Sequence, residues 1–154
     1  MHHATDPQQH GAAGAPQPGY RKPLPKIDAL TRPYWNYARA HVLSVQQCKA
    51  CGHHQFPPGP VCSHCLSEEL AWTPVSGLAT LVSWAEFHRA YWPAFAEDLP
   101  YNVVVVALDE GPHIVSNLVG ELARNPERLH QGLRLRAVFD DVTPEVSLVR
   151  FTAA

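Results

Sequence analysis

Between Gly77 and Thr152, hydrophobic residues come in short runs and alternations that are typical of β-strands. The longest is a nearly continuous run of valines, of the kind buried on both faces of a sheet, and the turn sequence Asp-Glu-Gly-Pro follows it. The pattern predicts five strands, at residues 77–89, 102–108, 113–119, 133–142 and 146–152. Five short strands favour a closed barrel, because closure removes exposed strand edges, and the OB-fold is the leading candidate for residues 75–154.

N-terminal to these strands, aromatic and apolar residues recur every three or four positions. This spacing predicts a short helix from Thr31 to about His41. Thr31 offers a hydroxyl to the free amides at the helix start, and Pro33 is tolerated in the first turn. The residues that repeat at this spacing form an aromatic face that must pack on another part of the chain: Tyr34, Tyr37, Ala38 and His41. An alternating segment around Val45 predicts a brief strand, so we expect residues 27–47 to form an N-terminal helix and strand.

Residues 1–26 have a composition that does not support a packed core. They hold five Pro, three Gly and three His, and Leu24 is their only large aliphatic residue. The apolar surface that such a segment can bury is too small to offset the entropy lost on ordering it. We therefore expect a disordered tail that becomes ordered only against a partner.

All the cysteines of the chain lie within 18 residues, in two Cys-x-x-Cys knuckles separated by ten residues: Cys48, Cys51, Cys62 and Cys65. Two such knuckles place four thiolates around one Zn²⁺, with metal–sulfur distances of about 2.3 Å. The pattern predicts a zinc ribbon at residues 48–74. Because four thiolates leave no open coordination position for water, we expect one structural zinc per chain.

Other uses of the cysteines remain open at this stage. Two disulfides are an alternative, although the chain shows no secretory signal that would favour them. Nothing marks either pair as a redox Cys-x-x-Cys motif. His53, His54 and His64 are close enough in sequence to be alternative zinc ligands, although four thiolates already complete the coordination shell.

Charge counts against nucleic acid as a partner. The chain carries 12 Lys and Arg against 14 Asp and Glu, a formal net charge of −2. Residues 76–154 hold six Arg and no Lys against ten acidic residues, whereas binding along a phosphate backbone needs clustered positive charge. Arg134 and Arg136 share a strand face and could meet phosphates, but such arginines are more often ordinary barrel exterior.

The sequence offers little for membrane insertion or catalysis. Its longest aliphatic run, at residues 103–108, is far shorter than the roughly 20 residues that span a bilayer, so we expect a soluble, cytoplasmic protein. Common nucleotide-binding, metalloprotease and serine-hydrolase motifs are missing from it. The best remaining acid–base pair is Glu86 with His88, which alternation places on one strand face, and we expect it to be a surface pair and the chain to have no activity of its own.

A cluster of aromatic residues lies between the first two predicted barrel strands, at Tyr91, Trp92 and Phe95. A barrel this small cannot easily bury three large aromatic side chains from one loop, and exposed aromatic patches mark interaction sites. The alternative is that these side chains plug one end of the barrel.

The whole arrangement resembles a family of zinc-ribbon plus OB-fold proteins, long classed as a domain of unknown function, that accompany thiolase-like and other acyl-CoA-handling enzymes. The resemblance covers residues 27–152 and leaves the tail outside it. The matching pieces run in order: Pro33-Tyr34-Trp35, Cys48-Lys-Ala-Cys51-Gly52, Phe56-Pro57-Pro58, Cys62-Ser-His-Cys65, Ser76-Gly77-Leu-Ala-Thr80, Leu99-Pro100-Tyr101, Val106-Ala-Leu108-Asp109-Glu110-Gly111-Pro112, Asn117-Leu-Val-Gly120 and Arg150-Phe151.

The resemblance implies a mainly β fold with an N-terminal helix, a rubredoxin-like zinc ribbon and a C-terminal five-stranded OB-fold barrel. It also implies a non-catalytic accessory subunit of a thiolase-superfamily enzyme that makes or breaks carbon–carbon bonds on acyl-CoA, as in aromatic or steroid acid degradation, or transfers acyl groups. The complex would contain two copies of each protein, and the barrel would close over the coenzyme A thioester. Partner contacts are expected at Tyr34, Trp35, Tyr91, Trp92 and Phe95. A small nucleic-acid-binding module is the alternative.

Overall fold

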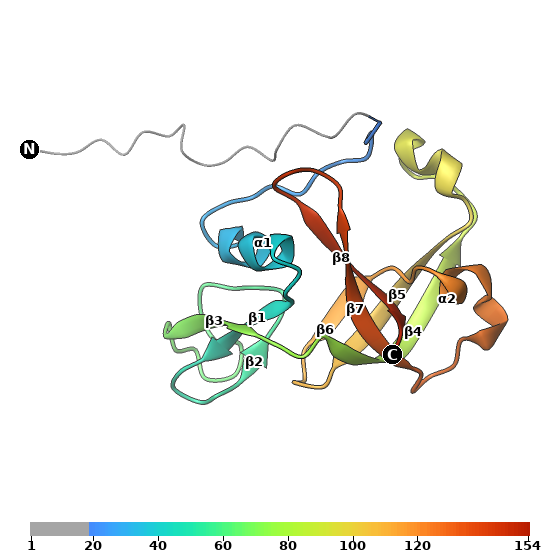
Figure 1. Ribbon diagram of the computed structural model, residues 1–154. Helices are drawn as coiled ribbons and strands as arrows, with labels where there is room; N and C mark the ends of the chain where they lie inside the picture. The colour runs from blue at the N-terminus through green and yellow to red at the C-terminus, as the bar shows by residue number, and fades with distance from the viewer. Residues whose placement is uncertain (1–18) are drawn as a thin grey trace, which may run out of the picture.

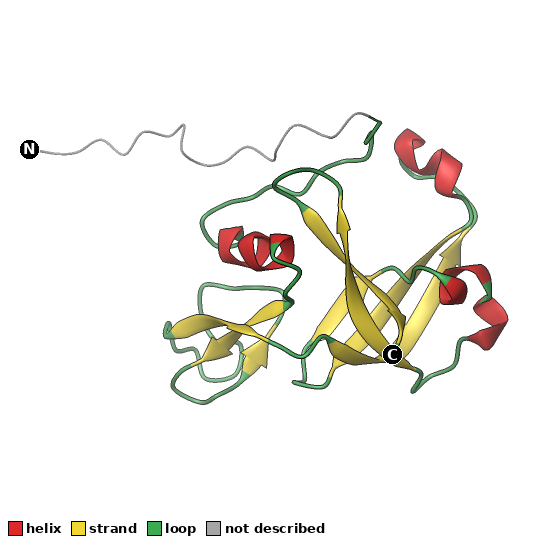
Figure 2. Ribbon diagram, viewed as in Figure 1, coloured by secondary structure: helices red, strands yellow, loops and turns green. Residues whose placement is uncertain are grey.

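A three-stranded sheet and a five-stranded sheet lie side by side in the computed structural model, which describes residues 19–154 (Figure 1). Strands dominate and the helices are short, so the predicted mainly β class is confirmed (Figure 2). The disordered tail predicted for residues 1–26 lies, for residues 1–18, outside the described residues. Within the described residues, no helix has the length and apolar character needed to cross a membrane.

Helix α1, Arg32–Arg39, forms where the aromatic spacing predicts it, with proline in its first turn and Thr31 at the N-cap position. The Thr31 hydroxyl does not cap the helix as expected. It accepts a hydrogen bond from the Asp28 amide at 3.1 Å and donates one to the Asp28 carboxylate at 2.9 Å. Asp28 competes successfully for this hydroxyl because the two residues face each other across the turn that precedes the helix.

The smaller sheet forms the ribbon and has the strand order β2-β1-β3. Strand β1, Ser44–Cys48, is the brief strand that the sequence predicts around Val45. It pairs antiparallel with β2, His54–Gln55, and with β3, Leu70–Pro74, neither of which the hydrophobic pattern indicated. Strand β2 has only two residues, and β3 shows no alternation of buried and exposed positions, so neither produces an alternating hydrophobic pattern. Their pairing depends on the fold of the whole ribbon.

The larger sheet contains the five strands predicted for the C-terminal part, within a few residues at each end. Its order is β6-β5-β4-β7-β8, all antiparallel. The strands are β4 Leu78–Phe87, β5 Tyr101–Leu108, β6 His113–Ser116, β7 Arg134–Asp141 and β8 Ser147–Ala153.

The larger sheet curls until its two edges meet. Strand β6 ends three residues before the prediction because the chain turns there to pair with β8 in parallel through a bridge between Leu118 and Phe151. The Phe151 amide donates to the Asn117 carbonyl at 3.0 Å, and the Val119 amide donates to the Phe151 carbonyl at 2.9 Å. This contact joins the two edges at one isolated bridge, and β4 pairs with β7 only at residues 78–80, so the sheet is a curled half-barrel and the complete closure expected from the sequence is not reached.

One hydrophobic core joins the ribbon to the barrel. Leu81, Leu135 and Phe151 are fully buried in the barrel, and Val45 of the ribbon belongs to the same cluster. The connection between the sheets is short, and its Gly77 has a φ of +75° and lies against Ala137, where a side chain would be crowded. The ribbon is therefore held in a fixed position on the barrel.

A second, smaller cluster lies where the β7–β8 loop meets the start of the described chain. Ile27, Val142 and Val146 are buried in it, and Tyr20 and Leu24 pack against them. In Figure 1 this N-terminal segment runs beside the β7–β8 loop before entering α1. The boundary at residue 27 stays a prediction, as do the other domain boundaries.

Three short helical segments complete the fold. The 3-10 helix η2, Pro93–Asp98, connects β4 with β5. Helix α2, Glu121–Arg124, and the 3-10 helix η3, Pro126–Arg128, connect β6 with β7. Leu122 of α2 is buried in the main core, so this connection covers one opening of the barrel.

Candidate metal centre and interaction surfaces

The two Cys-x-x-Cys knuckles have the same backbone hydrogen-bonding pattern. In the first, the Gly52 amide donates to the Cys48 carbonyl at 2.8 Å; in the second, the Leu66 amide donates to the Cys62 carbonyl at 2.9 Å. The residue after each knuckle has a left-handed backbone, with φ of +75° at Gly52 and +63° at Leu66. Each knuckle is thus a tight turn that points two thiols to one side.

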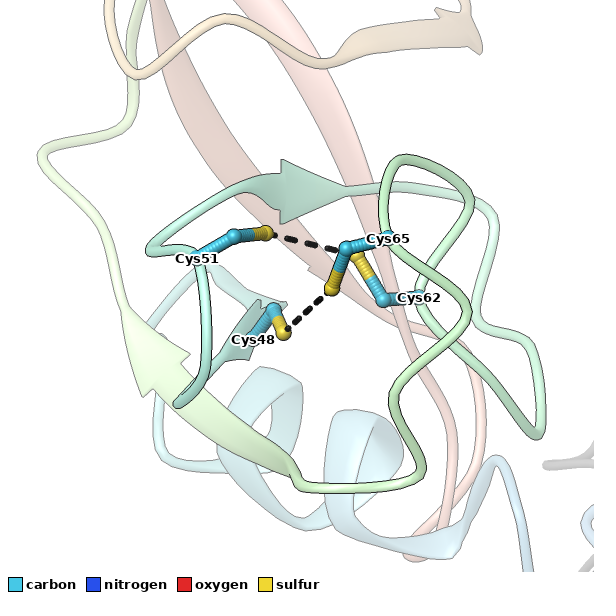
Figure 3. Close-up of side chains that lie close together, drawn as sticks. All are labelled: Cys48, Cys51, Cys62 and Cys65. Atoms are coloured by element: carbon cyan, nitrogen blue, oxygen red, sulfur yellow. Dashed lines mark hydrogen bonds between the residues drawn. The ribbon is translucent and has the colours of Figure 1, made fainter.

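The four thiol groups converge on one point between the knuckles (Figure 3). The Sγ atoms of Cys48 and Cys65 are 3.6 Å apart, those of Cys51 and Cys62 are 3.7 Å apart, and all four lie within 4.8 Å of one another. A tetrahedron with zinc–sulfur bonds of about 2.3 Å has edges of about 3.8 Å. The sulfur positions therefore fit a tetrahedral zinc ion.

Backbone amides of the knuckles favour the thiolate form of two cysteines. Amides from Cys51 and Ala50 hold the pKa of the Cys48 thiol down to about 6. Amides in the second knuckle likewise lower the pKa of Cys62, and the amide of His64 lies 3.4 Å from its sulfur. Thiolate is the form that binds metal, whereas burial and the neighbouring thiols raise the pKa of Cys51 and Cys65. The backbone therefore favours the metal-binding form at one cysteine of each knuckle.

The arrangement disfavours the alternatives left open by the sequence. A disulfide requires sulfurs about 2.05 Å apart, and all four cysteines are free. The converging group contains only thiols, and within the described residues no histidine nitrogen joins it. The rings of His53 and His64 instead stack on each other, with centroids 5.4 Å apart.

Two buried glutamines, Gln46 and Gln55, position the second knuckle, and the sequence pattern indicated neither. The Gln55 amide group donates to the Gln46 side-chain oxygen at 2.9 Å and to the Val61 carbonyl at 3.1 Å. The Gln55 side-chain oxygen accepts from the Ser63 amide at 2.8 Å, and the Gln46 oxygen accepts from the Gly59 amide at 2.9 Å. The only sequence signal is two polar residues in a segment that must fold tightly around a metal.

An aromatic arm extends from the barrel beyond the main core. We use this name for Phe87, Tyr91, Trp92, Phe95 and Tyr101 at the η2 end of β4 and β5. The rings of Phe87 and Tyr101 stack at 5.2 Å, and Phe95 lies 5.7 Å from Tyr101. These contacts leave Tyr91 73% exposed and Trp92 57% exposed, so neither side chain plugs the barrel.

The strand edge next to the arm has no paired strand among the described residues and faces α2 and η3 across a cavity of about 260 Å³. Strand β7 pairs with β4 only at residues 78–80, and β4 has an irregularity between Leu81 and Ser83. Beyond it, residues 83–87 pair with β5 on one side alone among the described residues. Trp84 is exposed there. An open strand edge with exposed aromatic side chains is a feature of protein-binding surfaces.

The two aromatic residues predicted on the helix are used inside the chain. Tyr34 packs between Phe56 and Trp72 of the ribbon, with ring centroids 5.5 and 6.1 Å away. Trp35 packs against the small cluster around Val142. Only partial exposure remains for contact with another protein.

The charged candidates lie on the surface and in ion pairs. His88 Nε2 is 3.0 Å from Glu86 Oε1, and both side chains are exposed. Arg134 donates two hydrogen bonds to Asp109, at 2.7 and 2.8 Å, which lowers the pKa of the Asp109 carboxyl. Arg134 is thus engaged with a carboxylate, which further weakens the case for phosphate binding.

A cavity of about 320 Å³ lies between the aromatic arm, α2 and β8, and Phe95 and Tyr101 of the arm line it. Two cations line it, but each faces an acid: Lys22 is 2.6 Å from Asp98, and Arg150 is 3.6 Å from Asp140. Its lining is therefore close to neutral and has no clear preference for an anionic ligand.

Family models match both parts of the chain. The ChsH2 rubredoxin-like zinc ribbon domain matches residues 35–71, and the ChsH2 C-terminal OB-fold domain matches residues 72–140.

Curated relatives give a more varied picture. A probable enoyl-CoA hydratase alpha subunit of Thermomonospora curvata is 31% identical over 138 residues, 90% of this chain, but the match spans only 42% of that relative. A DUF35 domain-containing scaffold protein of Methanocaldococcus jannaschii is 29% identical over 71% of this chain and 76% of its own length. A scaffold protein of the same description from Pyrococcus furiosus is 27% identical over 68% of this chain and 74% of its own.

Solved structures share the fold. A chain of the Ltp2-ChsH2(DUF35) aldolase superposes with a TM-score of 0.74 and 31% identity, covering 84% of this chain and 98% of that one. A DUF35 family protein of unknown function from Sulfolobus solfataricus has a TM-score of 0.57 at 11% identity, covering 82% of this chain and 86% of that one, which is a likeness of fold alone.

Proposed function

Because this chain belongs to the DUF35 family, with its ChsH2-type zinc ribbon and OB-fold domains, we propose that it is a non-catalytic accessory subunit of a thiolase-superfamily enzyme acting on acyl-CoA. The observation that carries the proposal is an exposed aromatic arm on a chain that matches 98% of one chain of the Ltp2-ChsH2(DUF35) aldolase. The reaction would be thiolytic, Claisen or retro-aldol chemistry, or acyl transfer.

In this proposal the chemistry belongs to the partner. A thiolase-like enzyme supplies its own active-site cysteine and stabilises the carbanion, whereas this chain supplies a docking surface. The Cys48, Cys51, Cys62 and Cys65 thiolates would hold one zinc, and a site of four thiolates is closed to substrate and water. Zinc would therefore stabilise the ribbon and take no part in the reaction.

The partner would dock on the aromatic arm. Tyr91 and Trp92 offer large apolar surfaces that the chain itself does not cover, and such residues dominate the binding energy of protein interfaces. Tyr34 and Trp35 would contribute mainly by fixing α1 on the ribbon and the β7–β8 loop. The coenzyme A thioester would be a ligand of the assembled complex, and we expect two copies of each protein in it.

Affinity purification from the native cells at moderate salt tests the proposal, with zinc measured in the same sample. The expected result is a stoichiometric thiolase-like companion and about one zinc per chain. Recovery of the chain alone would contradict the accessory role.

The same purification distinguishes the alternative of a nucleic-acid-binding module. Recovery of DNA or RNA, with binding to single strands that strengthens as salt falls, would support that alternative. The ten acidic residues against six Arg at residues 76–154, and the engagement of Arg134 by Asp109, lead us to expect no such binding.

A further inference from the structure

The two zinc knuckles differ at one position that their shared backbone makes comparable. Gly52 and Leu66 occupy the same place, each donating its amide to the carbonyl of the first cysteine of its knuckle. Both have a left-handed backbone, at φ of +75° and +63°. Glycine adopts this conformation freely, whereas leucine does so at a conformational cost because its Cβ crowds the backbone. The second knuckle therefore carries a strain that the first avoids.

Side-chain contacts within the described residues do not offset this strain. The Leu66 side chain is 74% exposed and belongs to neither hydrophobic cluster among residues 19–154. A large aliphatic group in this position loses backbone stability and gains no burial. Such an outlier is a reason to look for a function outside the folded chain.

His41 shows how the chain compensates the same strain elsewhere. Within the described residues it is the only other non-glycine residue with a positive φ, at +56°. Its Nε2 lies 2.9 and 3.0 Å from the two carboxylate oxygens of Asp141, and its ring stacks on Phe139 at 5.2 Å. These contacts fix the junction between ribbon and barrel. Leu66 has no equivalent within the structure.

We propose that Leu66 inserts into an apolar pocket of the partner enzyme, as a second contact separate from the aromatic arm. This inference rests on the proposed function, because the enzyme that receives Leu66 is the thiolase-like partner proposed above. In Figure 1 the ribbon and η2 lie at opposite ends of the molecule, so an enzyme that touches both would hold this chain along its length.

Charge around Leu66 indicates what borders the pocket. Glu68 and Glu69 follow it closely and are exposed, and Lys49 is the only Lys or Arg at residues 48–74. Two copies of this acidic tip would repel each other, which argues against a second copy of this chain as the occupant. The fitting surface is an aliphatic pocket with lysine or arginine at its rim.

The experiment compares two variants, each loaded with zinc and titrated with the purified companion enzyme. Leu66→Gly removes the side chain and the strain together, and Leu66→Met keeps an apolar side chain on the same backbone. We expect Leu66→Gly to weaken binding about tenfold or more, and Leu66→Met to bind within about threefold of the wild type. Zinc content stays at one per chain in both, and the unfolding temperature of Leu66→Gly does not fall.

Each other result overturns the inference. Equal affinity of Leu66→Gly and the wild type removes Leu66 from the interface while leaving the proposed function intact. If Leu66→Gly and Leu66→Met lose the same affinity for the companion enzyme, the loss does not come from removal of an apolar side chain. A wild-type dimer that Leu66→Gly converts to a monomer, measured by light scattering without companion, makes a second copy the occupant. If the wild-type chain binds no such enzyme, the proposed function fails as well.

Discussion

At the scale of single residues, the cysteines have the most specific role. Cys48 and Cys62 are buried, and their thiols approach those of Cys65 and Cys51 at the edge length of a zinc–thiolate tetrahedron. The site leaves no spare ligand. The stability of the ribbon therefore depends on each thiol separately.

Cys48→Ser is expected to lose zinc and unfold the two knuckles, because three thiolates bind the ion far less tightly and the residues around the cysteines are mostly exposed. Metal analysis together with circular dichroism measures both effects. His64→Ala is the matched control in the second knuckle and should retain one zinc, since the sulfurs converge without a histidine. Loss of zinc from His64→Ala would contradict the four-thiolate assignment.

Gln55→Ala is expected to destabilise the ribbon by about 1–3 kcal/mol, because it leaves the Ser63 amide and the Val61 carbonyl without the side chain that pairs with them, and the Gln46 oxygen with one donor in place of two. Denaturant unfolding of the zinc-loaded protein measures the change. Gln47→Ala, on the same strand, should have little effect, because its hydrogen bonds are long, at 3.4 and 3.5 Å. Equal effects of the two substitutions would show that the buried network does not hold the knuckle.

These residues also show what can be predicted from sequence. The four cysteines are predictable, because zinc chemistry requires those ligands at that spacing whatever surrounds them. Gln46 and Gln55 are not, because a glutamine becomes a buried hydrogen-bonding group only when the ribbon has folded around it. Leu66 is ordinary in the sequence, and only its backbone conformation singles it out.

At the scale of elements, α1 is fixed to the ribbon through Tyr34. Burial raises the pKa of the Tyr34 phenol to about 12, above its value of about 10 in an unfolded chain. A raised pKa means that the folded protein holds this proton more tightly than the unfolded chain does. The stability from this group is therefore complete below pH 10 and is lost as the pH rises from about 10 to 12.

Tyr34→Phe should therefore weaken the dependence of stability on pH between about 10 and 12. Denaturant unfolding at a series of alkaline pH values measures it. Tyr91→Phe, at an exposed position, is the matched control and should follow the wild type. If the two variants give the same curve, burial of Tyr34 is not what couples α1 to alkaline unfolding.

The aromatic arm is the second element with a testable role. Replacing Trp92 with Ser should weaken binding of the companion enzyme about thirtyfold while leaving the unfolding temperature unchanged, because its side chain is exposed in the free chain. Val115→Ser, another exposed apolar position, on β6, serves as a control and should bind normally. Calorimetric titration of the companion gives both affinities. Unchanged affinity of Trp92→Ser would move the interface away from the arm.

Elements were predictable where their own sequence specifies them. The barrel strands and α1 carry strong hydrophobic periodicity, so their positions follow from local pattern. The ends of β6 and the pairing of β2 and β3 depend on contacts far away in the sequence, such as the bridge between Leu118 and Phe151. Those features require the whole fold.

At the scale of the whole molecule, the ribbon and the barrel share one hydrophobic core. The ribbon lies at one end of the molecule and the aromatic arm, with η2, lies at the other. In the proposed complex, a companion enzyme that contacts both ends would lie along this chain. Glu86 and His88, the acid–base pair that the sequence offers, form an ion pair between exposed side chains. Glu86→Gln and His88→Ala should accordingly leave the activity of the assembled complex unchanged.

Turnover of acyl-CoA by the purified companion enzyme, titrated with the zinc-loaded chain, tests the accessory role most directly. The rate should rise with added chain and level off at one chain per companion subunit, while the chain alone gives no turnover. A companion that is fully active without the chain, or a chain that turns over acyl-CoA by itself, would contradict the account.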